Sequence, residues 1–267
     1  MTATPSRRLL ATSVAALLAL GSFTAQAVDG VVLIDQSRVL AGGVTPGDAP
    51  GYPVTISQPG SYRLSGNLTV TSPGLNAIEI RASNVTLDLN GFGIAGTGRG
   101  SGGGQGIVGF APGGTSVVVT NGSVRNMGSN GINLDSNIRI EKVLISGNGG
   151  YGVAVTTGAN ILNNNIVDNS GDGVLIGQAG VVGGSSGFVS GNLLYQNTGA
   201  GIHVRFGGRT LVAGNVANFN TGPGLLTGGA ATVGYVQNIF TENNAGGVQT
   251  VGGLQLGANL CNLGLCP

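Results

Sequence analysis

The residues best suited to chemistry lie in the short run Gly201-Ile202-His203-Val204-Arg205. His203 is the single histidine of the chain, and Arg205 follows it two positions later. Successive side chains of a strand point to opposite faces, so Ile202 and Val204 are predicted to point into a core, and His203 and Arg205 outward. Such a pair could bind an anionic group or move a proton near neutral pH. The alternative is a solvated pair without a function, and the sequence favours that alternative.

Acidic residues are scarce on the same outward face. Alignment of the repeats described below places Glu79 and Asp135 there, two repeats apart, which is roughly 10 Å at the spacing of paired strands. Glycoside hydrolysis normally uses two carboxylates about 5 to 9.5 Å apart. No complete catalytic set is therefore predicted. The catalytic candidates are His203, Arg205 and Asp135, and the binding candidates are Asn133, His203 and Arg205.

A metal site is not expected. One His, two Met and two Cys cannot assemble a typical transition-metal ligand set, and no group of carboxylates in adjacent repeats suits Ca²⁺. Asp168, Asp172 and Glu242 fall at predicted corners, where an acidic residue is commonly a turn residue. The sequence therefore predicts no cofactor.

A repeated sequence unit must position the side chains of these candidate residues. Gly131, Gly152 and Gly173 each open a run of alternating apolar residues, 21 residues apart, and a fixed period of this length indicates stacked units. Two columns of asparagine accompany the repeat. The first lies four residues before the glycine and comprises Asn148, Asn169, Asn197, Asn220 and Asn243. The second lies five residues earlier still and comprises Asn164, Asn192, Asn215 and Asn238.

Asparagine suits a structural role in such a stack. It tolerates the left-handed backbone of a sharp corner. Its amide both donates and accepts, so stacked copies can form a hydrogen-bonded ladder along the axis. Ligand binding by these amides is the less favoured alternative.

The repeat predicts an all-β fold. Each unit holds two or three short strands separated by tight corners, and no helical segment is available for a crossover between parallel strands. One turn of a coil per unit gives a parallel β-helix of about eight coils over residues 76–256. Gly-rich insertions at 96–104 and 179–187 explain the longer steps between units, and they could also supply residues to a site.

Several phrases carry a resemblance to a known family. They are ISQPGSYRLSGNLTV, NVTLDLNGF, the recurrent Asn-x4-Asn-x3-Gly-[Ile/Val] and the closing NLCNLGLCP. Together they resemble the right-handed parallel β-helix repeat proteins of the pectate-lyase-like superfamily, and within it a group of secreted bacterial proteins that mostly lack assigned functions. The resemblance implies a right-handed solenoid. It implies no single activity, because this fold hosts lyases, hydrolases, epimerases, adhesins and inert scaffolds.

The first 27 residues are predicted to be a secretory signal peptide. Arg7 and Arg8 precede an apolar run over 9–20, and Ala25-Gln26-Ala27 fits the small-x-small cleavage pattern. Ordinary secretion is favoured, and a twin-arginine signal is the alternative. Either route predicts a secreted or periplasmic protein, with no membrane span after removal of the signal.

The two ends of the solenoid are predicted to be covered. Residues 28–75 lack the repeat and are assigned to an N-terminal cap, because an open stack leaves unpaired backbone groups. The tail, 257–267, contains Cys261 and Cys266, and two cysteines at this spacing in an exported chain predict a small disulfide loop.

Charge limits the classes of partner. Without Arg7 and Arg8 the chain has 9 basic and 10 acidic residues, a net charge of −1, and no basic stripe that could neutralise the phosphates of a nucleic acid. The sequence therefore favours a binding or structural protein, directed toward a polysaccharide or the envelope surface. The alternative is a polysaccharide-active enzyme, a lyase or epimerase on an acidic polysaccharide. The sequence does not predict the oligomeric state.

Overall fold

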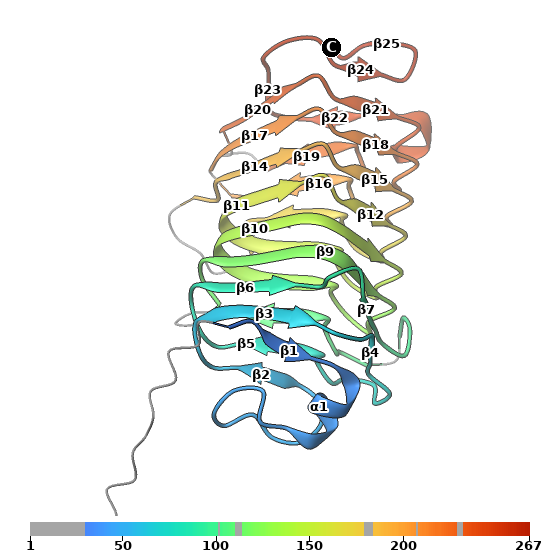
Figure 1. The fold of residues 1–267 in the computed structure, drawn as a ribbon. Helices are drawn as coiled ribbons and strands as arrows, with labels where there is room; N and C mark the ends of the chain where they lie inside the picture. Colours follow the sequence, from blue (N-terminus) through green and yellow to red (C-terminus); the bar gives the residue numbers. More distant parts are fainter. Residues whose placement is uncertain (1–29, 101, 110–113, 179–183, 207, 229–231) are drawn as a thin grey trace, which may run out of the picture.

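The computed structural model describes residues 30–100, 102–109, 114–178, 184–206, 208–228 and 232–267. The predicted signal peptide lies outside these ranges. The described chain winds into a parallel β-helix whose coils stack from the N-terminal to the C-terminal end of a rod (Figure 1). The prediction of an all-β, right-handed solenoid of about eight coils is confirmed.

The strands form three faces of the rod. The first face consists of β2 (Val54–Ile56), β5 (Ile78–Ile80), β8 (Ile107–Gly109), the starts of β10 (Ile132–Ser146) and β11 (Val153–Leu162), β13 (Val174–Ile176), β16 (Ile202–Val204), β19 (Leu225–Thr227) and β22 (Thr250–Val251). The second consists of β1 (Val32–Ile34), β3 (Gly60–Leu64), β6 (Val85–Asp88), the start of β9 (Val117–Arg125), the later parts of β10 and β11, β14 (Gly187–Ser190), β17 (Arg209–Ala213), β20 (Thr232–Val236) and β23 (Leu254–Gln255). The third consists of β4 (Leu68–Thr69), β7 (Gly93–Ala95), the ends of β9 and β10, β12 (Asn165–Val167), β15 (Leu193–Tyr195), β18 (Val216–Asn218), β21 (Ile239–Thr241) and β24 (Leu260–Cys261).

Adjacent coils pair in register, which stacks like residues into columns. Val153 pairs with Val174, Val174 with Ile202, and Ile202 with Leu225. All four side chains are fully buried, so each apolar position of the repeat fills the same layer of the core.

The glycine that opens each run is required by close packing. A Cβ added to Gly173 would lie 2.7 Å from the carbonyl oxygen of Gly201 and 3.0 Å from Nδ2 of Asn197. Real Cβ atoms do not approach backbone this closely, so Gly173 can be replaced only with a shift of the coil.

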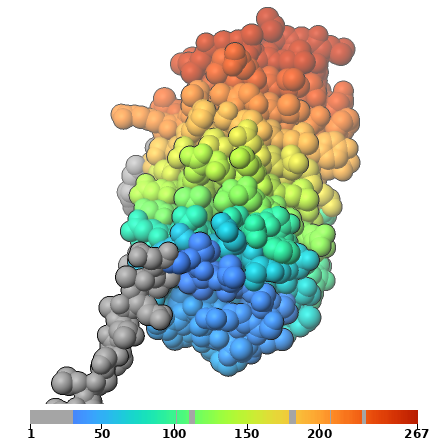
Figure 2. All heavy atoms as spheres, viewed as in Figure 1, coloured from blue at the N-terminus to red at the C-terminus, as the bar shows by residue number. Residues whose placement is uncertain are grey.

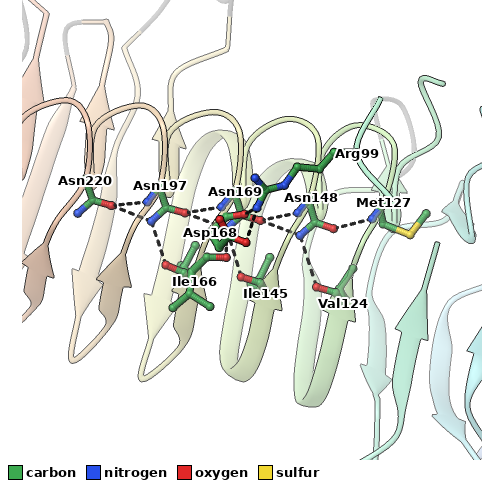
Figure 3. Close-up of polar contacts among 11 residues, drawn as sticks. Arg99, Val124, Met127, Ile145, Asn148, Ile166, Asp168, Asn169, Asn197 and Asn220 are labelled. Atoms are coloured by element: carbon green, nitrogen blue, oxygen red, sulfur yellow. Dashed lines mark hydrogen bonds and ion pairs between the residues drawn. The ribbon is translucent and has the colours of Figure 1, made fainter. Parts of the chain in front are cut away.

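The first asparagine column forms a continuous ladder at one corner (Figure 3). Nδ2 of Asn169 donates to Oδ1 of Asn197 at 2.9 Å, and Nδ2 of Asn197 donates to Oδ1 of Asn220 at 2.9 Å. Equivalent bonds extend the ladder from Asn148 to Asn243. The ladder then ends on Gln249, whose Oε1 accepts from Nδ2 of Asn243 at 2.8 Å.

The second column forms a parallel ladder at the next corner. It runs from Asn164 through Asn192, Asn215 and Asn238 and continues to Asn259, which sequence analysis missed. At the position of Val143, which breaks the column, the backbone N–H donates to Oδ1 of Asn164 at 3.0 Å. The ladder residues are almost wholly buried. Their amides therefore hydrogen-bond to one another and to backbone carbonyls.

The backbone explanation for the asparagines needs correction. The left-handed residue at each corner is the one before the ladder asparagine: Asp168 has φ 56° before Asn169, and Gln196 has φ 55° before Asn197. Glu242 has φ 54° and stands in the same place before Asn243. The residue that precedes each ladder asparagine makes the turn of the backbone. The side chain of the asparagine then points inward and hydrogen-bonds to the next asparagine along the axis.

Arg99, which belongs to the Gly-rich insertion, reaches this corner. The guanidinium of Arg99 donates to the carbonyl oxygen of Asp168 and pairs with its carboxylate (Figure 3). An insertion that leaves the coil is thus tied to a residue 69 positions later.

The N-terminal cap is shorter than predicted. Strands β2, β3 and β4 pair in parallel with β5, β6 and β7, so residues 54–69 already form a coil. The asparagine ladders begin later in the chain, at Asn148 and Asn164. The covering elements are β1, the segment after it and the short helix α1 (Gln36–Ala41), whose Val39 is fully buried.

The C-terminal tail is closed by the predicted disulfide, which is confirmed. Cys261 and Cys266 are bonded with an S–S distance of 2.09 Å. The bond holds β25 (Gly264–Leu265) antiparallel against β24, the last strand of the third face. Within the described ranges, no helix combines the length and the apolar character that a membrane span needs.

Candidate functional site

His203 lies on the outward side of the first face and pairs with an acid. Its Nδ1 lies 2.9 Å from Oδ2 of Asp172, and both side chains are mostly buried, with 17% and 11% of their surface exposed. The neighbours Ile202 and Val204 are fully buried in the core. His203 therefore points outward, as the alternation predicts, but a carboxylate from the preceding corner holds it.

Asp172 is itself fixed in place. Its Oδ1 accepts the backbone N–H of Ala200 at 2.7 Å. A Cβ added to Gly199 would lie 2.2 Å from that oxygen, so a glycine at 199 lets the carboxylate approach. An ionised carboxylate can only accept, so the imidazole carries its proton on Nδ1 when neutral, and Nε2 keeps a free lone pair.

Arg205 reaches back over the first face toward an aromatic ring. One terminal nitrogen donates to the hydroxyl of Tyr151 at 3.1 Å, and the guanidinium carbon lies 5.9 Å from the centre of the Tyr151 ring. The position one coil earlier is Gly177, which presents no side chain between them. A guanidinium held over a ring keeps several donors for a planar anion such as a carboxylate.

The outward column under this cluster is not an open surface. Leu175, which pairs with His203, is 1% exposed, and Ala154 and Val108 are also buried although they face outward. Leu226 is half-buried. The repeat spacing predicts an apolar patch of Leu175 and Leu226 that contacts either a partner or a packed loop. Leu175 is buried, so it offers no exposed surface to a partner.

Asn133 does not join the cluster. Its amide donates to Oε1 of Gln105 at 2.8 Å and accepts from Nε2 of Gln178 at 2.7 Å. Both of its polar atoms have partners within the chain, and the side chain is 6% exposed. Asn133 thus links the segments that contain Gln105 and Gln178.

Asp135 also lies apart from His203 and Arg205. It aligns with Thr156, since Leu134 pairs with Val155 and Ser136 with Thr157. Three strand spacings then separate it from Arg205, about 14 Å. Glu79, the other acid of the outward face, is paired with Arg81 at 2.8 Å.

Sequence analysis missed Asp172 and Tyr151 as site residues. Both stand directly before an opening glycine, at positions 172 and 151, and the corner places their side chains above the next coils. The position of Asp172 at a corner predicts only a turn residue, because the alternation of side chains within a strand gives no direction for side chains at corners. A search one position before each glycine would have found both.

The spacing of the repeats predicts that Gln249 aligns with His203 and Leu226. This register is wrong, because Leu226 pairs with Val251. The 3₁₀ helix Asn244–Gly246 adds residues at that corner, and the side chain of Gln249 becomes the last rung of the first ladder.

The cluster has the parts of a small acid–base and anion site. Asp172 orients His203, His203 offers Nε2, and Arg205 offers a cation beside the hydroxyl of Tyr151. Among the described residues, no three His, Cys, Asp or Glu side chains group closely enough to hold a metal ion.

Comparison with known proteins identifies the fold family. The family model described as "Right handed beta helix region" matches residues 29–183, more than half of the chain. No curated protein matches the sequence.

Two solved structures are similar at low identity. One is the enzymatically active domain of tailspike protein 2 of bacteriophage CBA120, with 15% identity and a TM-score of 0.37 over 78% of this chain and 41% of that chain. The other is the A-module of the mannuronan C-5 epimerase AlgE4 of Azotobacter vinelandii, with 14% identity and a TM-score of 0.39 over 79% of this chain and 76% of that chain. The chain thus spans less than half of the tailspike domain's length. By its family match and its coiled architecture, the chain belongs to the right-handed β-helix family.

Proposed function

We propose that the protein is an exported β-helix that binds an acidic polysaccharide on its first face. The observation that carries the proposal is the convergence of Arg205, Tyr151, His203 and Asp172 from three coils onto one outward surface. An arginine held over a tyrosine ring suits a sugar carboxylate, and the ring offers a face for the apolar side of a sugar.

The binding test uses defined uronate oligosaccharides and their neutral counterparts in calorimetric titrations. Saturable binding of the uronates is expected, with loss of about 10-fold or more in affinity for Arg205→Ala, since a charge-assisted hydrogen bond contributes roughly 1.5–3 kcal/mol. Arg209→Ala is the matched control: Arg209 is exposed on the adjacent face, and its loss leaves the affinity unchanged. A folded protein that binds no acidic glycan, or an Arg205→Ala variant that binds like the wild type, would refute the proposal.

The second candidate is a lyase or epimerase on the same class of polymer, and the pairing of Asp172 with His203 favours it. In such a reaction Nε2 of His203 would take the proton from the carbon beside the uronate carboxylate, whose charge Arg205 would neutralise. A lyase would then form a carbon–carbon double bond and expel the glycosidic oxygen, which would take the proton from the imidazolium and leave as an alcohol. An epimerase would return a proton to the opposite side of the same carbon.

Turnover separates the two candidates. Unsaturated products are followed by absorbance and epimerisation by NMR. His203→Gln and Asp172→Asn abolish turnover if the protein is an enzyme. If it is a binding protein, the wild type shows binding without turnover, and both variants keep binding within a few-fold.

Export is a further part of the proposal. It is supported by the signal-like pattern of residues 1–27 and by the disulfide, which is typical of oxidising compartments. The intact mass of protein recovered from cell fractions tests it: cleavage after Ala27 is expected, in the periplasm or the medium. A full-length, reduced protein in the cytoplasm would contradict it.

A further inference from the structure

A recess with a volume of about 290 Å³ lies in the N-terminal cap, at the blue end of the rod in Figure 2. It is lined by Val32, Arg38 and the segments 43–45 and 58–62. Part of its wall therefore comes from α1 and the segment that follows it, and part from the turn that leads into β3. Several coils separate this recess from the cluster of His203 and Arg205.

The base of the recess is apolar. Val32 and Tyr62 pair in β1 and β3, so their side chains lie side by side and point to the same face. Tyr62 and Val44 are buried, and Val32 is half-buried. The hydroxyl of Tyr62 donates to the carbonyl oxygen of Gln58 at 2.7 Å. This bond satisfies the polar tip of the tyrosine, so the base offers an aromatic ring and two aliphatic side chains to a ligand.

Arg38 is the one charged residue among the described residues of this lining. One of its terminal nitrogens donates to the carbonyl oxygen of Gly43 at 3.0 Å, and Gly43 also lines the recess. The bond holds the guanidinium at the recess and uses one of its five donors. Arg38 forms no ion pair with a described residue. Its remaining donors are therefore available to an anion.

Hydrogen bonds within the chain hold the walls of the recess. The carboxylate of Asp48 accepts from the backbone N–H groups of Val44 and Thr55 at 2.9 and 2.6 Å. The hydroxyl of Thr45 donates to the carbonyl oxygen of Thr55 at 2.6 Å. In the turn that forms the other part of the wall, Pro59 has a fixed φ. A recess that is already formed lowers the cost of ordering its residues when a ligand binds.

We infer that this recess binds a small carboxylate with an apolar body. The carboxylate pairs with the guanidinium of Arg38, since the two planar groups match in their hydrogen-bonding geometry. The apolar body packs on Tyr62 and Val44. One cation beside an apolar base suits a monoanion, because a second negative charge, as on a phosphate, would stay unpaired.

The size of the recess limits the ligand further. Its volume of about 290 Å³ lies just below the roughly 300–1,000 Å³ of pockets for drug-sized ligands. The ligand is therefore a small molecule and not a polysaccharide chain. This site is separate from the proposed polysaccharide site, and the inference does not rest on that proposal.

The test is an NMR titration of the isotope-labelled full chain with benzoate and with its neutral counterpart benzamide. Saturable shifts are expected for benzoate at the backbone amides of Gly43, Val44, Gly60 and Ser61, which line the recess. Benzamide is expected to bind about 10-fold or more weakly, because it lacks the charge that pairs with Arg38.

Two variants separate the role of the charge from that of the apolar base. Arg38→Ala removes the cation and is expected to raise the dissociation constant for benzoate about 10-fold or more. Val32→Phe fills the base, leaves the guanidinium in place and is also expected to weaken binding. Arg209→Ala is the matched control: Arg209 is exposed on a distant coil, and its loss leaves the constant unaltered.

Four results would overturn the inference. They are the absence of saturable shifts at the recess up to about 10 mM benzoate, equal affinity for benzoate and benzamide, wild-type affinity in a folded Arg38→Ala or Val32→Phe variant, and benzoate shifts confined to the surroundings of Arg205. The last result would assign the binding to the polysaccharide site. The dispersion of the NMR spectra shows whether each variant is folded.

Discussion

Asn197 shows what a ladder residue does at the scale of single atoms. Its Oδ1 accepts from the side chain and the backbone N–H of Asn169 at 2.9 and 3.1 Å. Its Nδ2 donates to Oδ1 of Asn220 at 2.9 Å and to the carbonyl of Ile166 at 3.0 Å. Every one of these partners is buried away from water, so the residue satisfies groups that solvent cannot reach.

Substitution Asn197→Ala is expected to destabilise the protein by about 2–4 kcal/mol, because it leaves buried donors and an acceptor without partners. The free energy of unfolding from urea titrations measures the loss.

The matched control is Asn218→Ala, two positions before the next ladder residue. Oδ1 of Asn218 is buried and has no partner among the described residues, so its removal is expected to change stability by less than about 0.5 kcal/mol. Equal losses in the two variants would show that the ladder bonds contribute little.

The site shows how far sequence reasoning reaches for individual residues. Alternation in a strand predicts the outward direction of His203 and Arg205, since it follows from backbone geometry alone. It could not predict that Asp172 binds His203 or that Tyr151 lies under Arg205. Those contacts join a corner to a strand, 31 and 54 residues apart, and they depend on how insertions set the register of the coils.

At the scale of elements, α1 is the piece that the sequence did not predict. Its six residues, Gln36–Ala41, are too few for a periodic signal. Asp35 caps the helix, because its carboxylate accepts the backbone N–H of Arg38 at 2.9 Å and the hydroxyl of Ser37 at 2.9 Å. These bonds to the charged form, that from the Arg38 backbone first and that from Ser37 next, lower the pKa of Asp35 below 3.8.

Because the carboxylate of Asp35 caps α1, the stability of the N-terminal end is expected to depend on pH in the acidic range. A carboxylate with a lowered folded-state pKa contributes stability that is present above 3.8 and is lost as the pH falls through the lower folded value. Asp35→Asn keeps a capping side chain but cannot titrate. The melting temperature of the wild type is therefore expected to fall more steeply below pH 3.8 than that of the variant. Parallel slopes in thermal unfolding followed by circular dichroism would refute this role.

Element boundaries were predictable where the repeat is strict. Between Gly131 and Ile176 the strands and corners repeat without insertions, and the alternation of apolar residues predicts them. The predicted register is wrong at Gln249, after the 3₁₀ helix, and the coil at 54–69 lies before the residues in which the sequence shows the repeat. The fold could thus be predicted from the repeat, and the coils outside its strict part could not.

At the scale of the whole molecule, stability is expected to vary along the rod. The strands of each coil pair only with those of the neighbouring coils, so the ends open more easily than the middle. The tail depends on the disulfide, because a bond closing so short a loop contributes about 2 kcal/mol by the chain-entropy estimate. Little else fixes β25.

Reduction of the disulfide should therefore loosen the tail without melting the coils. Hydrogen exchange is expected to quicken by about 30-fold in 260–265, the factor that corresponds to about 2 kcal/mol, while β10 and β11 keep their protection. Oxidised and reduced forms of the wild-type protein are compared at the same concentration and pH. Exchange that rises equally in β10 would show that the rod opens as one unit.

The two ladders have a consequence for the electric properties of the rod. In each, every asparagine amide before the last rung donates toward the next coil. The first ladder runs from Asn148 to Asn243, which donates to Gln249, and the second from Asn164 to Asn238, which donates to Asn259. Their amide dipoles therefore add head to tail, as peptide dipoles do along an α-helix, with the positive end toward the C-terminal coils. In a chain with only 8% charged residues, these stacked amides give the rod a permanent axial polarity, and each additional rung of the ladders increases it.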